Sequence, residues 1–99
     1  MTLLRAVDRL VDQIAHWTPS RWAASSAAPR VHALVQLLAD LDAEVEGLPR
    51  RPVPRLDNDL ALPDQLRVVA HDLVRAGADE ALLASAAAEV DAVRRAVLP

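Results

Sequence analysis

Cysteine, lysine, tyrosine and phenylalanine are absent from this sequence of 99 residues, and these absences narrow the classes of protein to which it can belong. Without cysteine the chain has neither a disulfide framework nor a thiolate metal site. The only aromatic residues are two Trp, so the hydrophobic 53% of the chain is mainly Ala, Leu and Val. Small aliphatic side chains of this kind suit closely packed helices rather than a sheet.

The same composition indicates the kind of organism that the protein comes from and the partners that its charge disfavours. All 11 basic residues are Arg, and the bias towards Ala, Val, Asp and Pro is typical of GC-rich bacterial genomes, so we expect a bacterial protein. The net charge is −3, whereas a nucleic-acid-binding domain normally carries a basic excess. Charges at positions 5, 8 and 9 interrupt any signal segment, and no apolar run approaches the ~18 residues that span a bilayer. We expect a cytoplasmic protein that does not bind membranes, and its acidic charge disfavours nucleic acid as a partner.

Four long stretches have apolar residues at three- and four-residue steps, and each predicts an amphipathic helix. Thr18 and Pro19 are suited to begin a short fifth helix. The expected helices span residues 2–17, 19–24, 29–46, 63–76 and 80–97. The helix over 29–46 has the widest apolar stripe, so we place it at the centre, in contact with at least two neighbours.

Residues 47–62 separate two helical halves and contain prolines at positions 49, 52 and 54, which exclude a regular helix and favour polyproline II geometry. The sequence therefore predicts one all-α domain over residues 1–99. It is a small antiparallel helical bundle of four main helices plus one short helix, whose halves are joined by a Pro/Arg-rich extended hinge. The tight turn at 76–79 and the corner at 18–29 are expected to pair consecutive helices antiparallel.

Acidic residues crowd the end of the helix over 29–46, where the helix dipole disfavours anions. These acids are Asp40, Asp42, Glu44 and Glu46, and the hinge that follows carries Arg50, Arg51 and Arg55. In one interpretation the arginines fold back and neutralise the acids. In the other, the stiff segment presents its arginines to a partner, since a preordered segment loses little entropy on binding.

Both Trp residues lie in the corner formed by residues 16–22, on either side of Arg21. This spacing lets the guanidinium lie on an indole ring. Trp17 continues the apolar stripe of the first helix and is expected in the core. Trp22 has only Ala around it in the short helix, so two interpretations stay open: a partly exposed interface anchor, or a ring that covers the open end of the bundle.

No residue pattern predicts catalysis, a cofactor or a metal site. The chain has too few glycines for a phosphate-binding loop, and its serines lack a nucleophile context. His16, His32 and His71 each fall on the polar side of a helix, so we expect them to be solvated. Asp42 is the one carboxylate expected to be desolvated, at the edge of an apolar stripe, where a structural role is the simpler interpretation.

The sequence therefore predicts a non-catalytic protein–protein interaction or adaptor module, either a homo-oligomer or a subunit of a larger bacterial assembly. The residues expected to contact the partner are Trp22, Arg21, Arg50, Arg51 and Arg55. One alternative is a small helical ligand-binding protein or enzyme with a polar site near Asp42. Another is a nucleic-acid-associated regulator, which requires a contiguous surface that joins Arg94 to the hinge arginines.

Overall fold

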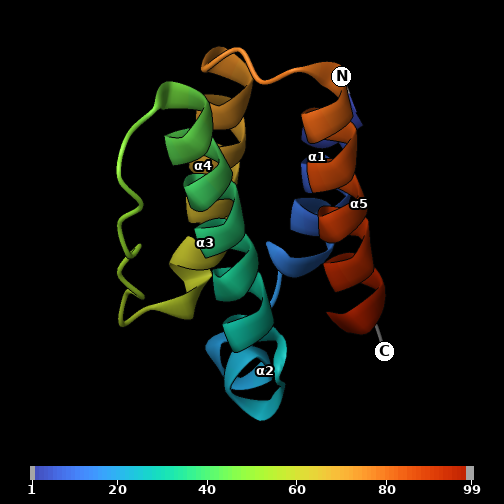
Figure 1. Ribbon diagram of the computed structural model, residues 1–99. Helices are drawn as coiled ribbons and strands as arrows, with labels where there is room; N and C mark the ends of the chain where they lie inside the picture. Colours follow the sequence, from blue (N-terminus) through green and yellow to red (C-terminus); the bar gives the residue numbers. More distant parts are fainter. Residues whose placement is uncertain (1, 98–99) are drawn as a thin grey trace.

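The computed structural model describes residues 2–97, and all the regular elements in that range are helices, which confirms the all-α class (Figure 1). Four long helices and one short helix form as expected, and a single 3₁₀ turn, η1, precedes the fourth long helix. In chain order the elements are α1 (Thr2–Ile14), α2 (Pro19–Ala24), α3 (Ala27–Glu46), η1 (Asp59–Ala61), α4 (Leu62–Arg75) and α5 (Glu80–Val97).

Two helix boundaries differ from the expected ones by more than one residue, and both ends of α4 differ by one. The first helix ends at Ile14 rather than at residue 17, because the chain turns there and the Trp17 N–H donates to the Ile14 carbonyl at 3.1 Å. α3 begins at Ala27, two residues before Pro29. Proline is tolerated in this first turn because the N–H groups there have no partner within the helix.

The helix ends are capped by residue types that favour these positions. The Thr18 hydroxyl accepts from the Arg21 N–H at 3.2 Å, and an Asp79 carboxylate oxygen accepts from the Leu82 N–H at 2.8 Å. Gly47 ends α3 in the left-handed conformation with φ of 70°. The next N–H, that of Leu48, then returns to the Ala43 carbonyl at 2.9 Å. This bond turns the chain back along α3.

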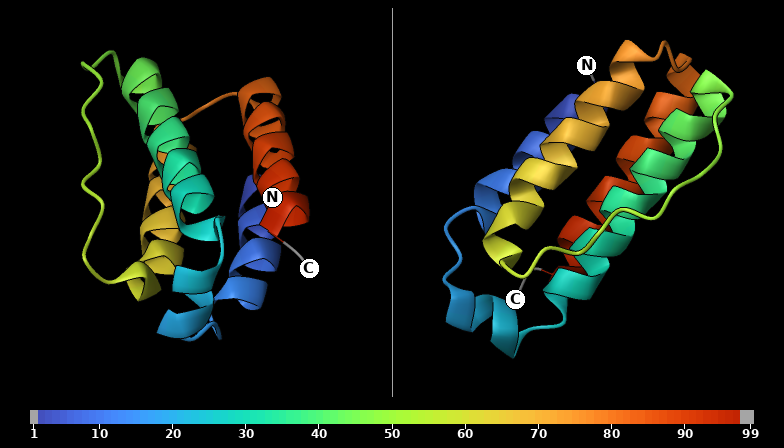
Figure 2. Two further views of the ribbon diagram at one scale, coloured as in Figure 1. Left: turned by 90° about the horizontal axis from the view of Figure 1, so that it is seen from below. Right: turned by 90° about the vertical axis from the view of Figure 1, so that its left-hand side faces the viewer.

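The pairing of the helices differs from the expected one. The largest interfaces join α3 to α4 and α1 to α5, and smaller ones join α1 to α4 and α3 to α5. Among the long helices, α1 and α3 therefore lie on one diagonal of a square and α4 and α5 lie on the other, whereas α3 and α4 are side by side (Figure 2). Because the chain after α3 returns along the bundle before α4 begins, α3 and α4 run in the same direction and end together (Figure 1).

The prolines after α3 explain why the chain returns along the bundle before α4 begins. We call residues 47–58 the strap. A polyproline II segment rises ~3.1 Å per residue, so these residues can span about 37 Å. The 20 residues of α3 need only about 30 Å at 1.5 Å per residue. The strap is therefore long enough to return the chain to the other end of the bundle, which a tight turn cannot do.

The core is built from the apolar stripes of all four long helices together with both Trp rings, and no polar or charged residue within 2–97 is buried. Trp22 is only 2% exposed, so the interpretation as a partly exposed anchor is wrong. Its helix, α2, packs against α3 and η1 across the end of the bundle. The ring consequently covers that end, as the other interpretation stated. Within the described range, none of the helices has the length and apolar character that crossing a bilayer requires.

Candidate functional site

The strap is fastened to α3 at one point by two side chains. Gln36 accepts the Val53 N–H on its Oε1 at 2.7 Å, and its Nε2 donates to the Arg51 carbonyl at 3.0 Å. His32 Nε2 lies 2.9 Å from the Val53 carbonyl, so this nitrogen carries the proton that is donated. Both backbone polar groups of Val53 are thus satisfied by α3. Extended backbone of this kind has no internal hydrogen bonds, so these side chains fix its position.

A third side chain and apolar packing complete the attachment. Gln65 of α4 donates to the Pro54 carbonyl at 3.3 Å, and the half-buried Val53 side chain packs against the core. On either side of this point the strap is exposed, and its two leucines are among the most exposed large hydrophobic residues, Leu48 at 59% and Leu56 at 48%. The strap is therefore held in one conformation while most of its side chains face solvent.

Sequence reasoning missed this attachment. His32 was expected to be solvated, and this is wrong: it is half-buried under the strap. Gln36 was not singled out at all, because it lies on the polar side of α3, between His32 and Asp40 at four-residue steps. A primary amide offers a donor and an acceptor and so matches a peptide group. A histidine and a glutamine four residues apart on the polar face of one helix, with an extended segment nearby in sequence, are the signal that could have revealed it.

The three strap arginines have three different environments. Arg50 forms an ion pair with Glu44, and the hydrogen bond and the charge of that carboxylate raise the pKa of Arg50. Arg55 pairs with Asp59 at 3.1 Å rather than with any acid of α3. Arg51 has no ion pair within residues 2–97. The arginines therefore neutralise only one of the four acids of α3.

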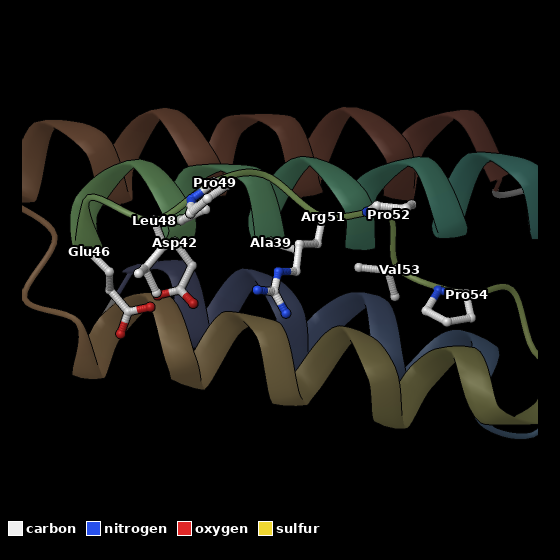
Figure 3. A pocket seen from close by; sticks show the side chains of 10 residues that line it. Ala39, Asp42, Glu46, Leu48, Pro49, Arg51, Pro52, Val53 and Pro54 are labelled. Atoms are coloured by element: carbon white, nitrogen blue, oxygen red, sulfur yellow. The ribbon is translucent and has the colours of Figure 1, made fainter.

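A groove of about 460 Å³ lies between the strap and α3 (Figure 3). Its lining is mainly aliphatic, with three charged side chains, and comprises Ala39, Asp42, Ala43, Glu46, Leu48, Pro49, Arg51, Pro52, Val53 and Pro54. Six of these ten residues are exposed, so this is a surface groove and not the enclosed polar cavity that an enzyme near Asp42 would need. The Arg51 side chain extends from the strap across the groove (Figure 3).

Two carboxylates at one end of the groove are uncompensated. Asp42 and Glu46 take part in no ion pair with any of residues 2–97, and Asp42 Oδ1 is buried without a hydrogen-bond partner in that range. They form a like-charged i,i+4 pair, which costs about 0.2–0.5 kcal/mol. The helix dipole destabilises an anion in the last turn of a helix by about a further 0.3–1 kcal/mol. α3 has no basic residue in that turn to offset this cost.

α4 extends this acidic end. Because α3 and α4 end together, Asp72 of α4 joins Asp42 and Glu46 around a second depression of about 390 Å³, with Arg75 as its one basic lining residue. Arg75 has no ion pair among residues 2–97. The negative ends of two helix dipoles therefore coincide with three carboxylates that no basic residue pairs with.

The tryptophan corner is a compact structural unit. The Arg21 guanidinium carbon lies 4.4 Å from the centroid of the Trp17 ring, the cation–π arrangement that the spacing predicts. The Trp17 and Trp22 rings are 5.0 Å apart, at an angle of 60°. Arg21 lines a separate depression of about 620 Å³ beside Trp17 and does not line the strap groove. The structure thus leaves the corner and the groove as separate surfaces.

The remaining predicted features do not form a second site. Arg94 lies on α5, on the side of the bundle away from the strap, and it faces Asp91 at 3.6 Å, so a contiguous arginine surface is not formed (Figures 1 and 2). No three metal-ligating side chains within the described residues come close enough together to hold an ion. The chain matches no protein-family model, no curated protein and no solved structure.

Proposed function

We propose that this protein is a non-catalytic interaction module, a cytoplasmic adaptor of bacterial origin, that binds another protein through the strap and its groove. The observation that carries the proposal is the attachment of the strap: its backbone is fixed at Val53 by Gln36 and His32, while the side chains on either side are exposed. Ordering a flexible side chain on binding costs about 0.5–1.5 kcal/mol, and a prefixed backbone avoids the larger part of the ordering cost.

The distribution of exposed apolar residues supports the same surface. Of the four large hydrophobic residues with the greatest exposure, Leu48 and Leu56 lie on the strap and Leu60 lies on η1, directly after it. Single exposed leucines are ordinary, but several on one side of a small protein are typical of an interaction surface. Extended Pro-rich segments are also one of the recurrent forms in which proteins are recognised.

Site-specific photocrosslinking tests this proposal. Benzoylphenylalanine is introduced at Leu56, on the strap, or at Glu89, an exposed residue of α5 on the other side of the bundle. Both variants are irradiated in the cells that naturally produce the protein, and the adducts are identified by mass spectrometry. We expect a discrete adduct from position 56 and none from position 89.

The identity of the adduct decides between the expected kinds of partner. A different protein crosslinked at position 56 supports the adaptor role, and a second copy of this chain supports a homo-oligomer. Adducts at position 89 alone would mean that α5, with its exposed alanines, carries the interface and that the strap does not. Absence of any specific adduct at both positions would overturn the proposed function.

A further inference from the structure

The chemistry of the strap groove points to the kind of partner segment that it takes. We infer that the groove binds an extended segment that carries large apolar side chains next to an Arg or Lys. This inference rests on the proposed function, since it assigns the partner of the same surface. Three features of the groove carry it: its apolar lining, its uncompensated carboxylates and the position of Arg51.

The apolar part of the groove has the length of a short peptide. Its wall is the strap from Leu48 to Pro54, and its floor includes Ala39 and Ala43 of α3. At ~3.1 Å per residue this wall is about 19 Å long, which matches an extended segment of roughly five or six residues. The two alanines leave space beside the exposed Leu48 side chain. Leucine-sized side chains of a partner therefore fit along this wall.

The end of the groove lined by Asp42 and Glu46, which we call the carboxylate end, determines the sign of the partner's charge. Asp42 and Glu46 have no ion pair, and the buried Asp42 Oδ1 lacks a hydrogen bond. Asp72 and the C-terminal ends of both α3 and α4 add to the negative potential at this end. A cation placed here gains an ion pair with the exposed Glu46 and the favourable potential of the nearby Asp42 and Asp72, whereas an anionic segment is repelled. The charge of the groove is thus complementary to Arg or Lys.

The position of Arg51 determines where the basic side chain of the partner segment can lie in the groove. Its guanidinium is drawn between the carboxylate end, with Asp42 and Glu46, and the end formed by Val53 and Pro54 (Figure 3). It has no ion pair within the described part of the chain, so its N–H groups are available to donate to the carbonyl oxygens of an extended segment. Its positive charge excludes a second cation from the middle of the groove. The partner's basic group therefore lies at the Asp42 end and its apolar groups towards Val53.

Nuclear magnetic resonance titration of the full chain with short peptides tests the inference. The probes are acetyl-Leu-Ala-Leu-Ala-Arg-amide and acetyl-Arg-Ala-Leu-Ala-Leu-amide, which cover both chain directions, and the same two peptides with Glu in place of Arg. We expect an Arg peptide to shift the backbone amide resonances of Ala43, Leu48 and Val53 and to saturate in the millimolar range, about 1–5 mM. The Glu peptides should leave these resonances in place.

Two charge-matched double variants separate a specific site from general attraction to an acidic protein. D42N/E46Q removes the carboxylates of the groove, and D8N/D12N removes a different i,i+4 pair of carboxylates, which is exposed on α1. We expect the first to weaken binding of the Arg peptide about tenfold and the second less than about twofold. The unchanged spectrum of the remaining residues shows that each variant is folded.

Several outcomes would overturn the inference. These are equal binding of the Arg and Glu peptides, equal weakening by both double variants, shifts that lie outside the groove, and no shift with any peptide up to about 10 mM. The proposed function has its own readout. A position-56 adduct together with failure of the Arg peptides leaves the interaction surface standing and rejects the partner chemistry, whereas loss of the adduct rejects the function itself.

Discussion

Replacing Gln36 with Ala tests whether its amide holds the strap. The side chain makes two hydrogen bonds to the strap backbone, at 2.7 Å to the Val53 N–H and at 3.0 Å to the Arg51 carbonyl, and one to Asp40 at 2.9 Å. The alanine variant keeps the helix, since Ala has the highest helix propensity, and removes all three bonds. The half-buried Val53 N–H then has no protein partner.

The expected size of the effect follows from these contacts. A hydrogen bond contributes about 0.5–1.5 kcal/mol net, so the two bonds to the strap contribute about 1–3 kcal/mol together. Because the strap can lift from α3 and regain water, we expect the loss of unfolding free energy near the lower end of that range. This is a measurable part of the ~5–15 kcal/mol that stabilises a domain of ordinary size.

Two measurements distinguish a detached strap from general destabilisation. Urea denaturation gives the change in unfolding free energy. Amide hydrogen exchange reports the Val53 N–H directly, and we expect its protection to be lost in the variant, whereas the core amides of α3 lose no more protection than the global change requires.

Gln65→Ala is the matched control, because it removes a single exposed bond of 3.3 Å to the Pro54 carbonyl. It should reduce stability by less than about 0.5 kcal/mol and leave the Val53 amide protected. If Gln36→Ala behaves in the same way as this control, the strap is not held by Gln36, and the argument for a prefixed binding segment fails.

Two further predictions concern the strap arginines and the tryptophan corner. Simultaneous replacement of Arg50, Arg51 and Arg55 by Ala should leave the urea midpoint nearly unchanged, since exposed ion pairs contribute little, but should weaken the position-56 crosslink. A large loss of stability with the crosslink retained would assign these arginines a purely structural role. Trp22→Ala should reduce the unfolding free energy by about 3–5 kcal/mol, because it empties a buried site. Trp22→Phe should reduce the unfolding free energy clearly less, since Trp22 Nε1 is buried without a partner and Phe has no such group. Urea denaturation followed by circular dichroism measures both values, and equal losses for the two variants would contradict this reasoning.

Local features of the fold could be predicted because they depend on residues close together in sequence. The apolar stripes, the cap at Asp79 and the left-handed Gly47 and Gly77 all follow from spacing and backbone preference. Capping by Asn58 is also a local feature, since its side chain accepts from the N–H of Leu60, two residues later, at 3.0 Å. Trp22 differs, because its helix packs against α3 and η1 and its ring lies against that of Trp17, all of which are outside α2.

The attachment of the strap could not be predicted for a similar reason. Gln36 and Val53 are 17 residues apart, and His32 and Val53 are 21 apart, so no helical spacing relates them. The amphipathic pattern assigns each residue to a face of its own helix but does not say what covers that face. A strap on the polar side of α3 converts His32 from a solvated residue into a hydrogen-bond donor.

Topology is what turns the acidic residues of α3 into a candidate site. If α4 followed α3 through a tight turn, its N-terminus would lie beside Glu46, and the positive end of its dipole would offset the acids. The proline-rich strap instead returns the chain along the bundle, so that α4 ends beside α3 and brings Asp72 to the same place. The same segment forms the wall of the groove that these carboxylates border. The prolines therefore create both the apolar surface and the uncompensated negative charge that a basic, apolar partner segment would complement.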